Sequence, residues 1–307
     1  MVRNSIQLYP LGYPVAVDPG PASRWTTEAL EAARESWGGG EARFDGRLVR
    51  VQIRARPGPP PAKAPPRFRA RRGWIQLICD ASNHGAFIPA RRMGRVCVST
   101  ELLLDRDWFR WHLLEPLVLA ALDHVFFTPL HAACVSRNGR SVLLCGDSGA
   151  GKSCLTYACV RRGWTLVSDD AVHLAPFPEN TVAGGSSVIR LREPARALFP
   201  ELREDPAGTA RNGKIAIEVT PRAGGFAVTR FATPSHIVFL ARRPGAARLH
   251  SYPAGKALAY FMKYLWHCDT SKHERRLQHL LAGGAQVLEV DGLESGVDAL
   301  ESLVAKS

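Results

Sequence analysis

Residues 146–153 read Gly-Asp-Ser-Gly-Ala-Gly-Lys-Ser, and this octapeptide matches the pattern G-x-x-x-x-G-K-[ST] of a phosphate-binding loop. Glycines let successive backbone amides turn inward around an anion, and the helix after such a loop adds the positive end of its dipole. The loop lysine contacts the β- and γ-phosphates of a nucleotide, and the last hydroxyl ligates Mg²⁺. The sequence therefore predicts a nucleotide site made by Gly146, Asp147, Ser148, Gly149, Ala150, Gly151, Lys152 and Ser153.

The residues around this loop supply the secondary structure that it needs. The apolar run SVLLC, residues 141–145, predicts a buried strand directly before the loop, and residues 153–162 predict a helix directly after it. Within residues 131–146, an Asn-Gly turn between apolar runs predicts a hairpin of two strands. A strand is expected next at 165–168, followed by strands at 214–219, 236–240 and 286–290 and helices at 254–267, 273–281 and 296–305.

Two adjacent carboxylates follow the predicted strand 165–168. Asp169 and Asp170 lie seventeen and eighteen residues after Lys152. Ligands of open α/β sheets bind at the carboxyl ends of the strands, so both side chains are expected near the loop. One carboxylate could hold Mg²⁺ while its neighbour takes the proton of an attacking hydroxyl. Each would also raise the pKa of the other, which favours a base that works nearer neutral pH. An isolated Asp-Asp pair is more often a turn, and only its distance from the loop favours the functional interpretation.

The amino-terminal part of the chain has a different pattern of expected strands and helices. Strands are expected within 5–17 and at 46–55, 73–79 and 94–100, and helices at 26–38 and 108–127, the second kinked or divided at Pro116. The proline-rich segment 57–67 predicts an exposed loop. The expected fold class is therefore α/β, with a smaller mixed α+β domain over residues 1–125 and a larger domain over 126–307 that contains the phosphate loop.

The composition excludes several classes of protein. The chain has 307 residues, 46% of them apolar and 22% charged, which is typical of globular domains and not of disordered chains. No run approaches the roughly 18–20 uncharged apolar residues that span a bilayer, and the amino terminus lacks a secretory signal. Seven cysteines form no CxxC pair. Free thiols in a reducing cytoplasm account for them better than disulfides or zinc.

The net charge of +12 is unevenly distributed. Residues 43–72 hold ten basic residues and one acidic residue, Asp45. Such a segment would attract phosphates or an acidic polypeptide, although a solvated surface is the plainer interpretation. Nucleic acid is a weaker expectation as partner, because no aromatic-interleaved recognition module accompanies the charge.

The ordered set of His131, GDSGAGKS (146–153) and RRGWTLVSDD (161–170) resembles the HPr kinase/phosphorylase family of bacterial serine kinases. That family carries a histidine about twenty residues before the loop lysine, a GxSGxGKS loop, a helix ending in RG and a DD strand end. The resemblance implies a P-loop kinase domain of HPr-kinase type, ATP at the loop and an oligomer. It also implies Lys152 on the phosphates, Mg²⁺ on Ser153, His131 near the reacting phosphate, and Asp170 as acceptor of a serine proton with Asp169 beside it.

This sequence also departs from the family pattern. Cys154, counted here with the nucleotide site, replaces the glutamate that usually follows the loop serine. At 188–191 the sequence VIRL keeps the arginine of an Glu-Ile-Arg-Gly-type strand but lacks its glutamate, for which Glu193 is a nearby substitute. The candidates for substrate contact and for the family's later catalytic arginine are Arg190, Arg192 and Lys214. The departures argue against the reverse, phosphorylase reaction and against HPr as substrate. The sequence is more similar to HPr-kinase-related proteins that phosphorylate a serine of a precursor peptide, including lasso-peptide kinases.

Three functions are compatible with these residues. The first is an ATP-dependent kinase for a serine in a peptide or small protein, supported by the loop, the acidic pair and His131. The second is a kinase of a small molecule that carries a hydroxyl. The third is a nucleotide-binding sensor with little turnover, which Cys154 and Val188 favour.

Overall fold

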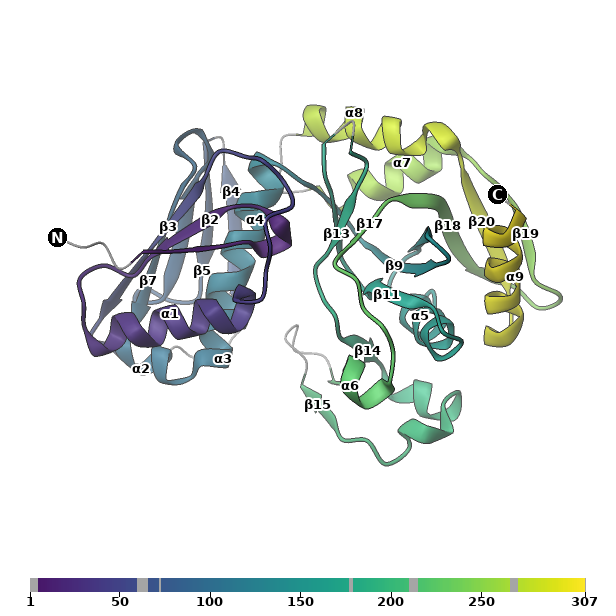
Figure 1. Cartoon of the computed structure of the whole chain (residues 1–307), viewed down its shortest axis with the longest axis horizontal. Helices are drawn as coiled ribbons and strands as arrows, with labels where there is room; N and C mark the ends of the chain where they lie inside the picture. The colour runs from purple at the N-terminus through teal and green to yellow at the C-terminus, as the bar shows by residue number, and fades with distance from the viewer. Residues whose placement is uncertain are drawn as a thin grey trace. The chain divides into compact units, whose positions relative to one another are not determined.

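The computed structural model describes residues 5–59, 66–71, 73–176, 179–209, 215–265 and 270–306. The chain divides into two compact units, Met1–Phe126 and Phe127–Ser307. Both combine β-sheet with α-helix (Figure 1). In the described part of the chain, no helix is long and apolar enough to cross a membrane.

The first unit is built on a seven-stranded sheet in the order β1-β2-β3-β7-β6-β5-β4. The predicted helix 108–127 runs as α3, one π-helical turn (Arg110–Leu114) and α4, with right-handed helical backbone at both junctions, so the helix is not divided at Pro116. Pro116 lies in the first turn of α4, where a missing amide donor costs little. The elements are β1 (Ile6–Leu8), β2 (Val15–Asp18), α1 (Arg24–Trp37), β3 (Val49–Arg56), β4 (Arg67–Arg71), β5 (Trp74–Ile78), β6 (His84–Ile88), β7 (Met93–Ser99), α2 (Thr100–Leu104), α3 (Arg106–Phe109) and α4 (Glu115–Val125).

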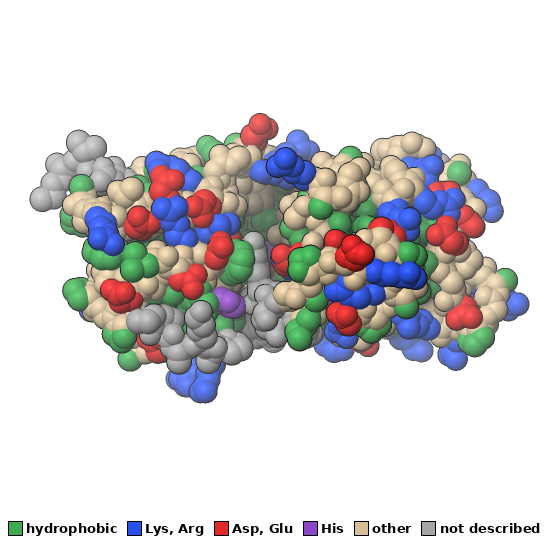
Figure 2. Space-filling model, turned by 90° about the horizontal axis from the view of Figure 1, so that it is seen from below, with side chains coloured by type: hydrophobic (Ala, Val, Ile, Leu, Met, Phe, Trp, Pro, Cys, Tyr) green, Lys and Arg blue, Asp and Glu red, His purple; other side chains and the backbone are tan. Residues whose placement is uncertain are grey.

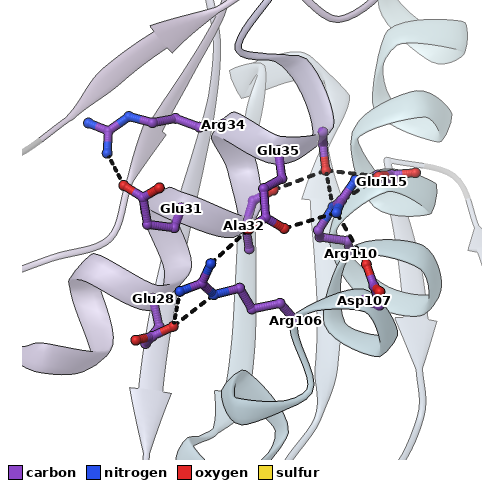
Figure 3. A network of polar contacts seen from close by, with 10 residues as sticks. Glu28, Glu31, Ala32, Arg34, Glu35, Arg106, Asp107, Arg110 and Glu115 are labelled. Atoms are coloured by element: carbon purple, nitrogen blue, oxygen red, sulfur yellow. Dashed lines mark hydrogen bonds and ion pairs between the residues drawn. The ribbon is translucent and has the colours of Figure 1, made fainter.

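Ion pairs join α1 to the helical segment that follows β7. Arg106 lies 2.8 Å from a carboxylate oxygen of Glu28 and 2.7 Å from one of Glu35 (Figure 3). Arg110 reaches the other oxygen of Glu35 at 2.9 Å. On the side of the molecule drawn in Figure 2, basic and acidic side chains are likewise interspersed. Arginine is therefore paired with acid in this part of the first unit.

The second unit centres on a six-stranded sheet in the order β11-β9-β10-β18-β20-β19, in which β10, β18 and β20 run parallel. Helices α5 and α9 pack on one face, and α7 and α8 on the other. Burial on both faces explains why the central strands are continuous apolar runs. The elements are β9 (Ala132–Arg137), β10 (Arg140–Cys145), α5 (Lys152–Arg161), β11 (Thr165–Ser168), β18 (Pro234–Arg242), β19 (Arg248–Tyr252), α7 (Ala254–Met262), α8 (Thr270–Leu280), β20 (Ala285–Val290) and α9 (Leu293–Lys306).

The predicted hairpin is confirmed, since β9 and β10 pair antiparallel around Asn138 and Gly139, whose φ angles are 52° and 76°. Residue 214 of the predicted strand 214–219 and residues 266–269 of the predicted helix 254–267 lie outside the described residues. Two small sheets contain no strand that the sequence predicted, apart from β16. They comprise β17-β13-β12-β8 and β14-β16-β15, with β8 (Thr128–Leu130), β12 (Val172–Leu174), β13 (Val182–Gly184), β14 (Ile189–Leu191), β15 (Ala207–Thr209), β16 (Ile215–Val219), α6 (Pro221–Gly224) and β17 (Phe231–Ala232).

Candidate active site

The loop 146–153 connects the central strand β10 to the first turn of α5. Gly146 has φ 149°, and a Cβ there would lie 2.8 Å from the Cβ of Ala150. Gly151, which precedes α5, has φ 99°. Both conformations strain any residue with a side chain, so these two positions require glycine, as the phosphate-loop pattern expects.

Lys152 and His131 contact each other although they are 21 positions apart in the sequence. The Lys152 ammonium donates to the Gly146 carbonyl at 2.6 Å and lies 3.0 Å from His131 Nε2. Burial lowers the pKa of Lys152, against the opposing effect of nearby carboxylates. Burial, and then the Lys152 charge, lower the pKa of His131. A neutral imidazole can therefore accept the ammonium hydrogen bond at Nε2.

The two carboxylates of the acidic pair have different surroundings. Asp169 is 2% exposed, and its Oδ2 accepts hydrogen bonds from Ser153 Oγ at 3.1 Å and from the Arg190 amide at 2.9 Å. Asp170 has a 63% exposed side chain, and its Oδ1 lies 3.4 Å from His131 Nδ1. The two carboxylates therefore have different neighbours: Asp169 lies beside the loop hydroxyl of Ser153, and Asp170 lies beside the imidazole of His131.

Burial raises the pKa of Asp169 to about 6, although hydrogen bonds from Arg190 and Ser153 act in the opposite direction. The charge of Asp170 also raises this pKa, but it is a smaller cause than burial. The mutual effect expected from two adjacent carboxylates is thus secondary at Asp169. The pKa of Asp169 is raised mainly because burial removes the hydration that stabilises its charged form.

Replacing Asp169 with asparagine should stabilise the metal-free protein at pH 8. A carboxyl whose pKa rises from 3.8 to about 6 on folding contributes stability that is complete below pH 3.8 and lost as the pH rises through 6. Ionised Asp169 therefore costs roughly 3 kcal/mol at pH 8, and Asp169→Asn removes that cost. Urea unfolding of the wild-type protein and of Asp169→Asn at pH 5 and pH 8, without Mg²⁺, measures this difference in the free energy of unfolding. An equal pH dependence in the two proteins would contradict the burial argument.

Asp169 Oδ1 is buried and has no hydrogen-bond partner among the described residues. A buried carboxylate oxygen without a partner is costly, and a hard cation would satisfy it. No cluster of three or more His, Cys, Asp or Glu side chains that could hold a metal occurs in the part of the chain that the structure describes. One carboxylate and one hydroxyl still fit Mg²⁺, which proteins bind through one or two carboxylates together with substrate phosphates.

The candidates near residue 190 are engaged in different ways. The Arg190 guanidinium lies 2.7 Å from Glu218 across the β14–β16 pair, and Arg192 Nη2 donates to Ser148 Oγ of the loop at 2.8 Å. Glu193 pairs with Arg196 at 2.8 Å. Arg192 is therefore the candidate arginine that contacts the loop, whereas Glu193 is held within its own helical turn.

The remaining two candidates are Cys154 and Lys214. Cys154 follows Ser153 within α5, and burial raises the pKa of its thiol. The thiol is therefore held as the neutral, less nucleophilic form. Lys214 lies outside the described residues.

Helix α7 and the residues directly after it contribute three residues that the sequence analysis missed. The Tyr260 hydroxyl lies 2.7 Å from the His131 carbonyl, 2.8 Å from the Gly146 carbonyl and 3.1 Å from the Gly146 amide. Lys263 Nζ is 2.8 Å from Asp147 Oδ1, and the ring of Tyr264 lies 4.6 Å from that of His131. Spacings of three and four residues place them on one helix face. No local signal connects that face to a loop more than a hundred residues earlier.

For the ATP-dependent phosphoryl transfer that the sequence predicts, replacing Tyr260 with phenylalanine should lower kcat on the order of tenfold while KM for ATP stays within about twofold. The hydroxyl anchors the His131 backbone and the entry to the loop together, so its loss misplaces groups around the phosphate without removing one that binds it. Steady-state kinetics of Tyr260→Phe measures the change. Tyr252→Phe is the matched control, because that ring stacks on Phe239 at 4.2 Å in β18 and no site contact depends on it. Equal effects of both substitutions would contradict the positioning role.

Comparison with known proteins finds similarity in the segment that contains His131, the phosphate loop and the acidic pair. The family model for the HPr Serine kinase C-terminal domain matches residues 126–191. HPr kinase/phosphorylase from Caldicellulosiruptor bescii is 33% identical over 92 residues, which are 30% of this chain and 26% of that protein. The protein of the same name from Limosilactobacillus reuteri (strain DSM 20016) is 44% identical over 60 residues, 20% of this chain and 19% of that protein.

The matches therefore cover only about a quarter or a fifth of these relatives. A solved structure of the HPr(Ser) kinase/phosphatase from Coxiella burnetii covers 58% of this chain and 99% of its own, with 15% identity and a TM-score of 0.29, too low to support a conclusion about fold. The segment that carries the sequence matches contains His131, the phosphate loop and the acidic pair. Residues 126–191 of this chain are therefore similar in sequence to the C-terminal domain of the HPr kinase family.

Proposed function

We propose that this protein transfers the γ-phosphoryl group of ATP to a serine hydroxyl of a peptide or small protein. One observation supports this most strongly: Lys152 of the phosphate loop and the exposed carboxylate of Asp170 contact the two nitrogen atoms of one imidazole, His131. A phosphate-binding cation and a carboxylate open to solvent are thus held on opposite sides of one small ring. Phosphoryl transfer to an incoming hydroxyl needs a phosphate-binding cation and a proton acceptor within one site, and this arrangement supplies both.

In this proposal the loop amides and Lys152 bind the β- and γ-phosphates of ATP. Ser153 and Asp169 would hold Mg²⁺, which when bound neutralises charge on those phosphates. Asp170 takes the proton from the serine Oγ as a bond forms between that oxygen and the γ-phosphorus. The bond from the γ-phosphorus to the bridging oxygen breaks, and ADP leaves. His131 orients Asp170 through Nδ1 and Lys152 through Nε2.

A second candidate, a nucleotide sensor with little turnover, is supported by one observation. Glu193, which could replace the family's missing magnesium-associated glutamate, is instead paired with Arg196. Asp169 is then left as the carboxylate proposed for the metal. The same pairing supports the expectation that the reverse, phosphorylase reaction is weak.

Measuring ADP formation with Mg²⁺–ATP alone, with a serine-containing peptide library and with free serine separates these functions. The kinase proposal expects ADP formation that depends on peptide and yields phosphoserine. Stimulation by free serine and not by peptides would assign a small-molecule kinase instead. Tight ATP binding without turnover under every condition would assign the sensor.

A further inference from the structure

One face of the seven-stranded sheet in the first unit carries unpaired positive charge. We call it the arginine face. It is formed by side chains of β3, β4 and β7 that point to one side of the sheet, namely Arg50, Arg54, Arg56, Arg67, Arg69, Arg71 and Arg95.

The alternation of side chains along the strands separates this face from the core. In β3 the residues Val49, Val51 and Ile53 are at most 1% exposed, whereas the arginines between and after them are exposed or half-buried. The core face packs on α4, because a Cβ on Gly85 of β6 would lie 2.7 Å from Leu117 of that helix. The arginine face is the opposite, solvated side, as antiparallel sheets commonly have.

The strand register arranges the arginines as two borders around a neutral strip. Arg95 of β7 lies opposite Ala86 of β6, Ala86 lies opposite Gln76 of β5, and Gln76 lies opposite Arg69 of β4. Three strand spacings separate the two arginines, which is about 14 Å. A strip of that width accommodates one extended chain or one helix with its side chains.

These arginines differ from those on the helical side of the same unit. Arg106 and Arg110 are neutralised by glutamates (Figure 3). Among the described residues, no arginine of the arginine face forms an ion pair with a carboxylate. Asp18 of β2, which borders this face, accepts a hydrogen bond from the Gly20 amide. Asp18, in register with Gln52 of β3, is the one carboxylate among the described strand residues of this face, so the face keeps an excess of positive charge that attracts an acidic group.

We propose that the arginine face binds an acidic segment of a polypeptide, laid along the neutral strip between the two borders. Extended chains repeat their side-chain direction every second residue, at roughly 7 Å, and so do the arginines of β4. A segment with a carboxylate at every second position is thus the complementary ligand. Nucleic acid is less favoured, because Trp74 is the aromatic residue that the described strands of this face present, and single-strand sites use several stacking rings.

Binding by this face does not depend on catalysis, but a role in presenting a peptide for phosphorylation rests on the proposed function. The test is the affinity of the full-length protein for a labelled peptide that alternates glutamate and serine, measured by fluorescence anisotropy at low salt. The comparison variant is Arg69→Glu/Arg95→Glu. The matched control, Arg24→Glu/Arg222→Glu, makes the same change of net charge at exposed arginines of α1 and α6, outside the strands that form this face.

We expect the arginine-face variant to bind the peptide at least tenfold more weakly and the control to stay within twofold. The wild-type affinity should also fall as salt rises past ~0.15 M, where the screening length is about 8 Å. Equal weakening in both variants, or equal affinity for a glutamine–serine peptide, would overturn the proposal. Tighter binding of an oligonucleotide of equal charge, lost in the same variant, would assign the face to nucleic acid instead.

The affinity for Mg²⁺–ATP, measured by calorimetry without peptide, should be unchanged in both variants, which separates loss of the arginine face from damage to the nucleotide site. Thermal unfolding shows whether each variant is folded. If the charge reversal unfolds the protein, Arg69→Gln/Arg95→Gln removes the same charges with less repulsion, and an unchanged peptide affinity in that variant would overturn the proposal.

Discussion

Replacing Asp170 with asparagine should lower the rate of phosphoryl transfer by roughly two to four orders of magnitude, the usual contribution of a general base. Asparagine keeps the size of the side chain and much of its hydrogen bonding, but it cannot accept a proton from serine. Asp170 is exposed beside His131, and the loop hydroxyl contacts Asp169 instead. The affinity for Mg²⁺–ATP should therefore stay within a few-fold. Single-turnover transfer and calorimetric nucleotide binding measure the two quantities.

The neighbouring carboxylate provides an internal comparison. Asp169→Asn should weaken the use of Mg²⁺, with part of the activity recovered at high Mg²⁺ concentration, because Asp169 is the carboxylate beside Ser153. Asp291→Asn, at an exposed position, is the neutral control. If Asp170→Asn abolishes nucleotide binding, the roles of the two carboxylates must be exchanged. Normal transfer by Asp170→Asn would show that the base assignment is wrong.

Replacing Lys152 with alanine should lower phosphoryl transfer on the order of a hundredfold or more. The substitution removes the charge that stabilises the transferring phosphoryl group while the loop amides stay in place. Nucleotide affinity should fall much less than the rate, since the amides still bind the phosphates.

The Lys152→Ala substitution should also change a second measurable quantity, the pKa of His131. The charge of Lys152 is one cause of the lowered pKa of His131, so the pKa of the imidazole should rise in Lys152→Ala. Titration by NMR follows that change. Lys306→Ala, near the end of α9, is the matched control and should leave both readouts unchanged. Near-normal turnover by Lys152→Ala would mean that this loop is not the reacting site.

Local sequence patterns were sufficient for the loop and its flanking elements. The glycines of the loop have positive φ as their pattern requires, and the Asn138-Gly139 turn forms the expected hairpin. These features are local, because a turn or a loop is specified by a few adjacent residues. The approach of His131 to Lys152 followed from resemblance to a family, since no periodicity relates two residues 21 positions apart.

Long-range contacts account for what the sequence analysis did not find. Tyr260 reaches the loop because β10 and β18 are adjacent in the central sheet and α7 covers that sheet. Strand order is set by packing of the whole unit, which a single sequence does not reveal. Likewise, the basic segment 43–72 gave an excess of charge, but the register between β7, β6, β5 and β4 was needed to locate Arg95 on the same face.

The most direct test of the proposed function follows the γ-phosphoryl group itself. Wild-type protein and Lys152→Ala are each incubated with γ-labelled ATP, Mg²⁺ and a serine-containing acidic peptide, and the label on the peptide is measured against that on inorganic phosphate. The proposal predicts label on the peptide serine, formed with an equal amount of ADP and reduced at least a hundredfold in the variant. Label released only as inorganic phosphate, or equal transfer by both proteins, would contradict it.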